Sequence, residues 1–452
     1  MSFSFTSRIS RLAGGLLLAA ACAQQKPPPP RNVVFLLVDT LRADHLPLYG
    51  YGRNTSPALT ALAGESVLFS SARAQSSCTF PSVNSILTSR YPAVFLGQPG
   101  GAMGLPAGIP GLAEILRHRG FRTVAISASP VVRRSPSRFN PGGGYDRGFE
   151  RFDEECLWKP ADCVVERARG ELRRGGRPLL LYLHFMDPHG PYLPPPYHRR
   201  RFAFGHPAKR FVQQGDPNPI ANWLYRGGPD PGLTAEDLRY LVDLYDDKIA
   251  FFDTQLDLLL RAIRRAGLLD ETILVFAADH GEEFMEHGQI KHCRTVFDSS
   301  VRVPLLLRIP GGGRGRELAT PAQNVDILPT LLDYLGVPAA GFAFAGRSLR
   351  PAIEGTALAS SYQWSAQGTE RGVADGRFKL VFDLATRHFA LYDLAADPGE
   401  RRDVLRDHRG DAQRLRRAMA NWIASSEGSA AGDSVRQAAE AESRLRSLGY
   451  LE

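Results

Sequence analysis

Cysteine is scarce in the 452-residue chain, which contains five of these residues. None of them lies with histidines at the spacing of a structural zinc site, no nucleic-acid-binding module is recognisable, and no segment repeats. The net charge of +8 is small for this length, so the basic residues are interpreted as solvated surfaces. With 43% hydrophobic and 23% charged residues, the chain has the composition of a globular protein, and no nucleic-acid partner is expected.

A short apolar run precedes the first candidate strand. It covers residues 12–21, follows two arginines, and is too short to span a bilayer but long enough for a signal-peptide core. It ends at Cys22 in a pattern that resembles a bacterial lipoprotein cleavage site. We therefore expect a lipoprotein-type signal peptide at residues 1–22, with Cys22 lipidated, and a proline-rich tether at residues 23–31. The protein is expected to be exported and anchored in a membrane, on the periplasmic side of the outer membrane, with plain secretion as the alternative.

Four further cysteines would meet an oxidising environment outside the cytoplasm. Cys156 and Cys163 are close enough in sequence to close a short loop, and Cys78 and Cys293 both flank candidate site residues. Neither pairing follows from the sequence, and free buried thiols remain the alternative.

Alternating strand and helix patterns predict an α/β domain over residues 32–350, with a mixed, mainly parallel sheet sandwiched by helices. Residues 32–38 form a continuous apolar run, which predicts a strand buried on both faces. Further strands are expected at residues 122–127, 178–185, 272–278 and 303–309. Helical periodicity covers residues 57–64, 111–119, 164–174, 234–265 and 324–335, and a further helix begins at Pro81. Residues 193–233, rich in proline, glycine and aromatics, are expected to form a surface loop that sets specificity.

The pattern changes after residue 350, where a C-terminal subdomain at residues 351–452 is expected. Short strands at 362–365, 372–382 and 388–394, with a helix at 410–425, predict a small antiparallel sheet covered by a helix.

Three expected strands end in polar residues: Asp39, the segment from His184 to His189, and the pair Asp279 and His280. Ligands of open α/β sheets bind outside the carboxyl ends of the strands. A carboxylate pair, an imidazole and a Thr79 oxygen make a divalent-metal site. Taken singly, each of these residues could instead be an ordinary cap or a satisfied buried group.

Thr79 lies just before the helix expected at Pro81, where free N–H groups and the helix dipole favour an anion. A hydroxyl at this position could attack a phosphoryl or sulfuryl centre, since a cation lowers the pKa of an oxygen acid by many units. An ordinary threonine cap is the alternative.

Five segments carry a resemblance to a known family. They are NVVFLLVDTLRADH at 32–45, TFPSVNSILTSR at 79–90, HFMDPHGPY at 184–192, DHGE with EHG at 279–288, and LYDL with DP at 391–398. With these segments the chain resembles the sulfatase family of the alkaline phosphatase superfamily, nearly end to end from residue 32 to 451.

The resemblance has informative departures. Thr79 stands where sulfatases carry the cysteine or serine that is oxidised to formylglycine, and the arginine of that motif is absent, so no formylglycine is expected. Thr40 replaces the second aspartate of the metal pair. The active-site lysine has no counterpart in register, since Lys291 is offset. Thr nucleophiles occur in superfamily relatives that handle phosphorus, among them phosphoethanolamine transferases with one metal.

The resemblance implies a role for each matching residue. Asp39, Thr79, Asp279 and His280 are expected to hold one divalent ion (Ca, Mn, Mg or Zn). Thr79, His189 and His292 are expected to be catalytic, and His184 and Lys291 to contact substrate.

The sequence therefore predicts a Thr-nucleophile member of the sulfatase family: a metal-dependent hydrolase of sulfuric or phosphoric esters, with phosphoryl substrates favoured. The ester would be a small molecule, a glycan or a lipid. The alternatives are a phosphoryl-group transferase of the phosphoethanolamine or glycerophosphate type, and an inactive binding protein with the same fold.

Overall fold

The computed structural model describes residues 1, 30–92, 104–106, 108–137, 139–198, 201–203, 232–359 and 361–428. The expected signal peptide, Cys22, nearly all of the tether, most of the loop at 193–233 and the stretch after 428 lie outside these residues. Within the described part of the chain, no helix is both long and apolar enough to cross a membrane.

An eight-stranded sheet forms the centre of the protein, in the order β11-β2-β10-β7-β1-β6-β4-β5. Its strands are β1 (Asn32–Val38), β2 (Val67–Phe69), β4 (Arg122–Ser127), β5 (Arg151–Asp153), β6 (Leu179–Phe185), β7 (Thr272–Ala278), β10 (Leu305–Arg308) and β11 (Arg316–Leu318). The strands from β7 to β5 are parallel, whereas β10 runs antiparallel to both of its neighbours. The predicted mixed, mainly parallel sheet is thereby confirmed.

Strand β1 lies at the middle of the sheet, and all seven of its residues are buried. Alternate residues point to opposite faces: Val34 and Leu36 join one hydrophobic core, and Val33 and Phe35 join the other. This two-sided burial explains why the apolar run is continuous rather than alternating.

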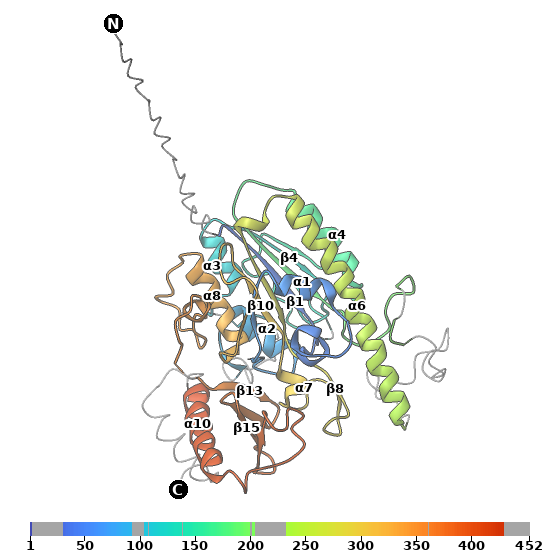
Figure 1. Ribbon diagram of the computed structural model, residues 1–452, viewed down its shortest axis with the longest axis vertical. Coiled ribbons are helices and arrows are strands. Elements are labelled where there is room, and N and C mark those ends of the chain that lie inside the picture. Colours follow the sequence, from blue (N-terminus) through green and yellow to red (C-terminus); the bar gives the residue numbers. More distant parts are fainter. Residues whose placement is uncertain are drawn as a thin grey trace.

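Helices cover both faces of the sheet (Figure 1). The first core includes residues of α1 (Pro57–Ala63), α4 (Ala161–Leu172) and α6 (Ala235–Arg265). The second includes residues of α2 (Thr79–Thr88), α3 (Leu112–His118) and α8 (Ile327–Tyr334). The predicted sandwich is therefore confirmed, with each core formed between the sheet and its own set of helices.

Short elements connect this framework. They are the 3-10 helices η1 (Ala43–His45), η2 (Pro47–Tyr49), η5 (Leu269–Glu271) and η6 (Asn324–Asp326), the helices α7 (Asp298–Val301) and α9 (Arg350–Ile353), the paired strands β3 (Ala72–Arg73) and β12 (Ala322–Gln323), and the hairpin of β8 (Glu283–Phe284) and β9 (Ile290–Lys291).

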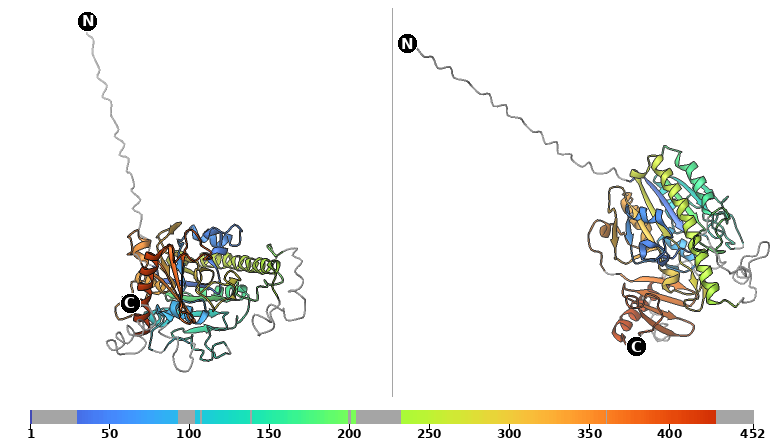
Figure 2. Two further views of the ribbon diagram at one scale, coloured as in Figure 1. Left: turned by 90° about the horizontal axis from the view of Figure 1, so that it is seen from below. Right: turned by 45° about the vertical axis from the view of Figure 1, so that its right-hand side comes forward.

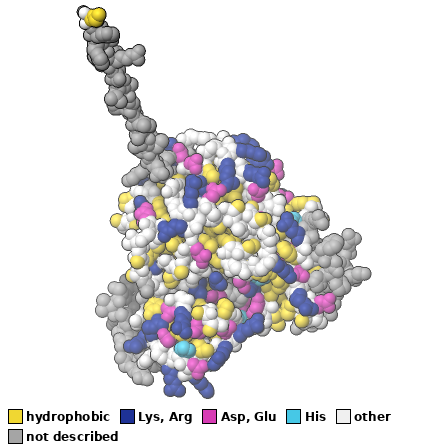
Figure 3. Space-filling model, viewed as in Figure 1, with side chains coloured by type: hydrophobic (Ala, Val, Ile, Leu, Met, Phe, Trp, Pro, Cys, Tyr) yellow, Lys and Arg dark blue, Asp and Glu magenta, His cyan; other side chains and the backbone are white. Residues whose placement is uncertain are grey.

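The C-terminal unit is an antiparallel sheet packed under a helix, as Figure 2 shows from two further sides. It comprises β13 (Gln363–Gln367), β14 (Glu370–Ala374), β15 (Phe378–Asp383), β16 (His388–Asp393) and α10 (Arg409–Gly428). The single strand expected at 372–382 is divided by a turn in which Gly376 has a φ of 102°. On the face in Figure 3, basic and acidic side chains are mixed over this unit, in keeping with solvated charged surfaces.

Strand β13 joins the C-terminal unit to the segment before α2. The Ala366 N–H donates to the Gln75 carbonyl at 2.9 Å, and the Ser76 hydroxyl donates to Gln367 Oε1 at 2.6 Å. The Gln367 amide also donates to the Cys293 carbonyl at 3.1 Å. The C-terminal unit thus supports two chain segments that lead into the site described below.

Candidate active site

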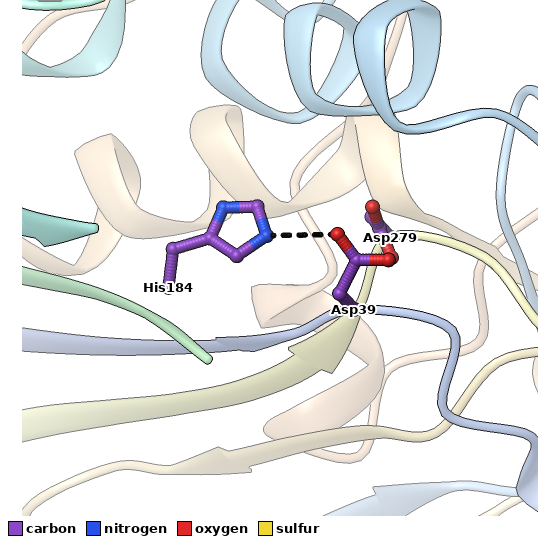
Figure 4. Close-up of side chains that lie close together, drawn as sticks. All are labelled: Asp39, His184 and Asp279. Carbon is purple, nitrogen blue, oxygen red and sulfur yellow. Dashed lines mark hydrogen bonds and ion pairs between the residues drawn. The ribbon is translucent and has the colours of Figure 1, made fainter. Parts of the chain in front are cut away.

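Three neighbouring strands bring Asp39, His184 and Asp279 together at one edge of the sheet. Strand β1 is parallel to β6 and β7, with Leu37 opposite His184 and Val38 opposite Ala278. One ligand atom from each of the three side chains lies within 4.8 Å of the others. Figure 4 shows His184 pointing at Asp39, to which its Nε2 is 3.4 Å distant.

The four predicted metal ligands converge on one point. His280 Nε2 lies 3.2 Å from Thr79 Oγ1, 3.4 Å from Asp279 Oδ2 and 3.9 Å from Asp39 Oδ1. His280 Nδ1 lies 2.9 Å from the Gly281 carbonyl oxygen, which can only accept a hydrogen bond. A neutral His280 therefore carries its proton on Nδ1 and directs the Nε2 lone pair at the cluster.

Burial makes this cluster a fitting cation site. Asp39 and Asp279 are 1% and 0% exposed, and among the described residues Asp39 Oδ1 and Asp279 Oδ2 have no hydrogen-bond partner. Burial and the Asp39 charge raise the pKa of Asp279 to about 6. Burial opposes ionisation of Asp39 too, but His184 and the nearby histidines hold the pKa of Asp39 below its usual value. Two adjacent buried carboxylates need a compensating charge, and oxygen and imidazole donors suit a divalent metal ion.

Thr79 is the first residue of α2, and Cys78 is its N-cap. The sequence had placed the helix start at Pro81; the structure begins it two residues earlier, which corrects that boundary. Proline is tolerated there because it lies in the first turn, where N–H groups have no intrahelical acceptor. Thr79 is 5% exposed, and its hydroxyl faces the ligand cluster.

A disulfide joins Cys78 to Cys293, and a second joins Cys156 to Cys163. The sequence suggested both pairings but left free thiols as the alternative, and the structure contains the two disulfides. In this state Cys78 has no free thiol to be oxidised. That Thr79 takes the place of a formylglycine stays a prediction. The first disulfide also ties the start of α2 to the segment that carries His292.

His189 and His292 lie side by side, with ring centroids 5.0 Å apart. His292 Nδ1 is 2.9 Å from Glu282 Oε1, and although burial disfavours the cation, Glu282 raises the pKa of His292 above its ordinary value. His189 Nδ1 instead faces the Gly190 carbonyl at 2.6 Å, and burial lowers the pKa of His189 to about 4. The surroundings therefore favour the protonated form of His292 and the neutral form of His189.

The remaining predicted residues lie around the cluster. His184 is fully buried, and its Nδ1 lies 3.1 Å from the Tyr182 hydroxyl. Its position in the cluster with Asp39 and Asp279 makes it a further candidate metal ligand. Its contact with substrate stays a prediction. Lys291 lies in β9 beside His292, and burial lowers its pKa to about 8. The Thr40 N–H donates to Asp279 Oδ1 at 3.2 Å, so this replacement of an aspartate contributes its backbone to the site.

Two residues that support the site were missed from the sequence. Lys248, buried in α6, donates to the His189 carbonyl at 2.8 Å and pairs with Asp187 at 3.1 Å. Glu282 is the partner of His292 described above. For Lys248 the available signal was a lysine inside the apolar face of a helix. For Glu282 the signal was its position two residues after His280.

Comparison with known families decides the assignment. The sulfatase family model matches residues 31–337, and the model of the C-terminal region of N-sulphoglucosamine sulphohydrolase matches residues 285–426. The chain belongs to the sulfatase family. Members of this family of ester hydrolases are metal-dependent, in agreement with the cluster of Asp39, His184 and Asp279.

Curated relatives include arylsulfatase K of Danio rerio, 30% identical over 219 residues that cover 45% of this chain and 42% of the relative. Choline-sulfatase of Rhizobium meliloti is 26% identical over 275 residues, covering 57% of this chain and 52% of the relative. The matched region thus spans about half the length of these relatives.

Among solved structures, phosphonate monoester hydrolase of Agrobacterium radiobacter has a TM-score of 0.68 at 23% identity, covering 90% of this chain and 97% of that one. This similarity is one of fold, and the fold is that of the alkaline phosphatase superfamily, as expected from the sequence motifs.

Removing the Cys78–Cys293 disulfide tests its positioning role. The cross-link spans 215 residues of sequence, so we expect the double substitution C78A/C293A to lower the free energy of unfolding by about 2–5 kcal/mol. The turnover number should fall as well, because the disulfide between the neighbouring Cys78 and Cys293 no longer fixes Thr79 relative to His292. Urea unfolding and steady-state kinetics measure the two effects. The matched control C156A/C163A opens a loop of 7 residues and should cost less stability; unchanged turnover in C78A/C293A would contradict the positioning role.

Proposed function

We propose that the protein is a metal-dependent hydrolase of sulfuric or phosphoric esters in which Thr79 is the nucleophile, with phosphoryl esters favoured. The observation that carries the proposal is the position of the Thr79 hydroxyl. It lies at the N-terminus of α2, 3.2 Å from His280 Nε2, and this same nitrogen is 3.4 Å from Asp279 Oδ2 and 3.9 Å from Asp39 Oδ1. A nucleophile, an anion-binding helix end and a cation site thus share one point.

The metal would be held by Asp39, Asp279, His280 and Thr79, with His184 beside Asp39. When bound, it supplies positive charge that stabilises the transferring group and favours ionisation of the Thr79 hydroxyl. The identity of the ion is open among Ca, Mn, Mg and Zn.

The ionised Thr79 oxygen attacks phosphorus or sulfur in line, so that its bond to the central atom forms as the bond to the leaving oxygen breaks. N–H groups in the first turn of α2 bind the developing negative charge. A covalent ester of Thr79 results. Water then attacks the same centre, releases phosphate or sulfate, and restores the Thr79 oxygen.

His292 is assigned as the general acid. Its Nδ1–H donates to the Glu282 carboxylate, which stabilises the imidazolium and leaves Nε2–H to protonate the leaving oxygen. In the second step His292 takes a proton from the attacking water. His189 is assigned a catalytic role beside His292: with its Nδ1–H directed at the Gly190 carbonyl, a neutral His189 presents an Nε2 lone pair that accepts a hydrogen bond from a hydroxyl of the substrate or from water.

The departures from the formylglycine motif support phosphorus over sulfur, since a formylglycine hydrate is the nucleophile of true sulfatases and Thr79 replaces it here. The substrate class is a small-molecule, glycan or lipid ester. We further propose export and membrane anchoring through Cys22, on the periplasmic side of the outer membrane; the two disulfides support an oxidising location.

Substitution of Thr79 tests the nucleophile. Initial rates are measured on matched aryl sulfate, phosphate monoester, phosphate diester and phosphonate substrates, each with Ca, Mn, Mg or Zn. We expect phosphoryl activity that falls about 10³-fold or more in T79A and partly survives in T79S, which keeps a hydroxyl. T60A, on the exposed side of α1, is the control and should match the wild type.

The alternatives predict other outcomes for the same panel. Sulfate hydrolysis that survives T79A would place the nucleophile elsewhere. No turnover on any ester, with tight binding of the products, would favour an inactive binding protein, and turnover that requires an added acceptor alcohol would favour a transferase.

Substitution of His292 tests the proton donor. H292N should lower kcat by about 10²–10⁴-fold for esters of weakly acidic alcohols, which need a proton to leave. It should have far less effect on 4-nitrophenyl esters, whose leaving group departs as an anion. The dependence of kcat on leaving-group pKa is measured for H292N, H189N and wild type. An equal loss for all leaving groups in H292N would contradict the assignment.

A further inference from the structure

Two large aromatic side chains are exposed beside the candidate site. Trp158 is 45% exposed and Phe139 is 37% exposed, and their ring centroids lie 5.8 Å apart at an angle of 72°. The Trp158 ring is also 5.8 Å from the His189 ring. Together the two rings offer an apolar surface next to the polar site that a ligand can cover.

Trp158 stands at the outer end of a row of rings that begins at the nucleophile. Thr79 contacts His280, the His280 and His292 rings are 4.6 Å apart, and the His292 and His189 rings are 5.0 Å apart. Trp158 follows His189 in this row. A group attached to the oxygen that His292 protonates would therefore extend toward the indole, on the leaving-group side of the site.

The loop that carries Trp158 is built to hold it in place. The Cys156–Cys163 disulfide closes the loop around Trp158, and the backbone N–H of Trp158 donates to the Ala128 carbonyl at 3.0 Å. The Ala161 N–H donates to Asp187 Oδ2 at 2.8 Å, and Asp187 lies two residues before His189. The loop is thus fixed both to the end of β4 and to the segment that carries His189.

The backbone of Trp158 has a φ of 57°, in the left-handed region. A bulky side chain is unfavourable there and glycine would be relaxed. Such strain persists where the surrounding structure holds the residue in a functional position, and here the disulfide and the hydrogen bond to Ala128 do so.

We propose that Trp158, backed by Phe139, is the platform on which the leaving group of the substrate lies, and that it sets the preference for ring-bearing over acyclic leaving groups. The inference rests on the proposed ester hydrolysis. A pyranose or aryl ring offers a flat apolar face that stacks on indole, whereas an acyclic alcohol does not. Trp158 is in this respect a specificity-determining residue, and it takes no part in the bond-making steps.

The test compares W158G, W158F and wild type on esters of the same acid: a phenyl ester, a glucose 6-ester and an ethyl ester. Glycine keeps the left-handed backbone and removes the ring, and phenylalanine keeps a ring. We expect W158G to raise KM for the phenyl or the glucose ester by about tenfold or more, with kcat nearly unchanged, and W158F to stay close to wild type. The ethyl ester should not respond. L258A, which removes an exposed apolar side chain from α6, is the control and should not differ from wild type.

A binding arm separates this inference from the proposed hydrolysis. Calorimetry measures the affinity of T79A and of T79A/W158G for the same three esters. A loss of affinity confined to one or both ring-bearing esters supports the platform, even if no ester is turned over, and shows whether the ring is a sugar or an aryl group. Equal effects of W158G on the ring-bearing and ethyl esters, or no effect on any of them in a protein with unchanged melting temperature, would overturn it.

Discussion

Two carboxylates buried side by side are the constraint on which the site depends. Asp39 and Asp279 follow adjacent parallel strands in register, so the sheet itself places them together. Because carboxylates removed from water repel each other strongly, the fold tolerates the pair only with positive charge beside it. The imidazoles of His184 and His280 face the pair as further donors, and a divalent cation among these donors would supply the compensating charge.

The rest of the molecule fixes what surrounds that pair. Helix α2 presents Thr79, and the Cys78–Cys293 disulfide links it to the segment of His292. Strand β13 of the C-terminal unit holds both segments through Gln367, which bonds Ser76 and the Cys293 carbonyl. The C-terminal unit therefore acts on the site by supporting chain segments, without placing one of the predicted catalytic side chains in it.

Strong local patterns were readable from the sequence, and tertiary arrangements were not. The strands at 32–38, 122–127 and 272–278 were predicted to the residue. The clearest signal was at 32–38, where burial on both faces leaves a continuous apolar run. The antiparallel direction of β10 and the three-residue strands β2, β5 and β11 were missed, since pairing between distant segments decides them.

The candidate site was also predictable in part. The convergence of Asp39, Thr79, Asp279 and His280 followed from strand ends and family motifs. The contributions of Lys248 and Glu282 depend on tertiary contacts, and Trp158 lies in a loop without periodicity, so no clear signal for them was present in the sequence.

The most direct measurement on the central cluster is the metal content of the purified protein at neutral pH, by mass spectrometry of the elements. About one divalent ion per chain is expected, and D39N/D279N should lose it. A folded wild-type protein that retains no Ca, Mn, Mg or Zn, and binds none on addition, would contradict the cation site.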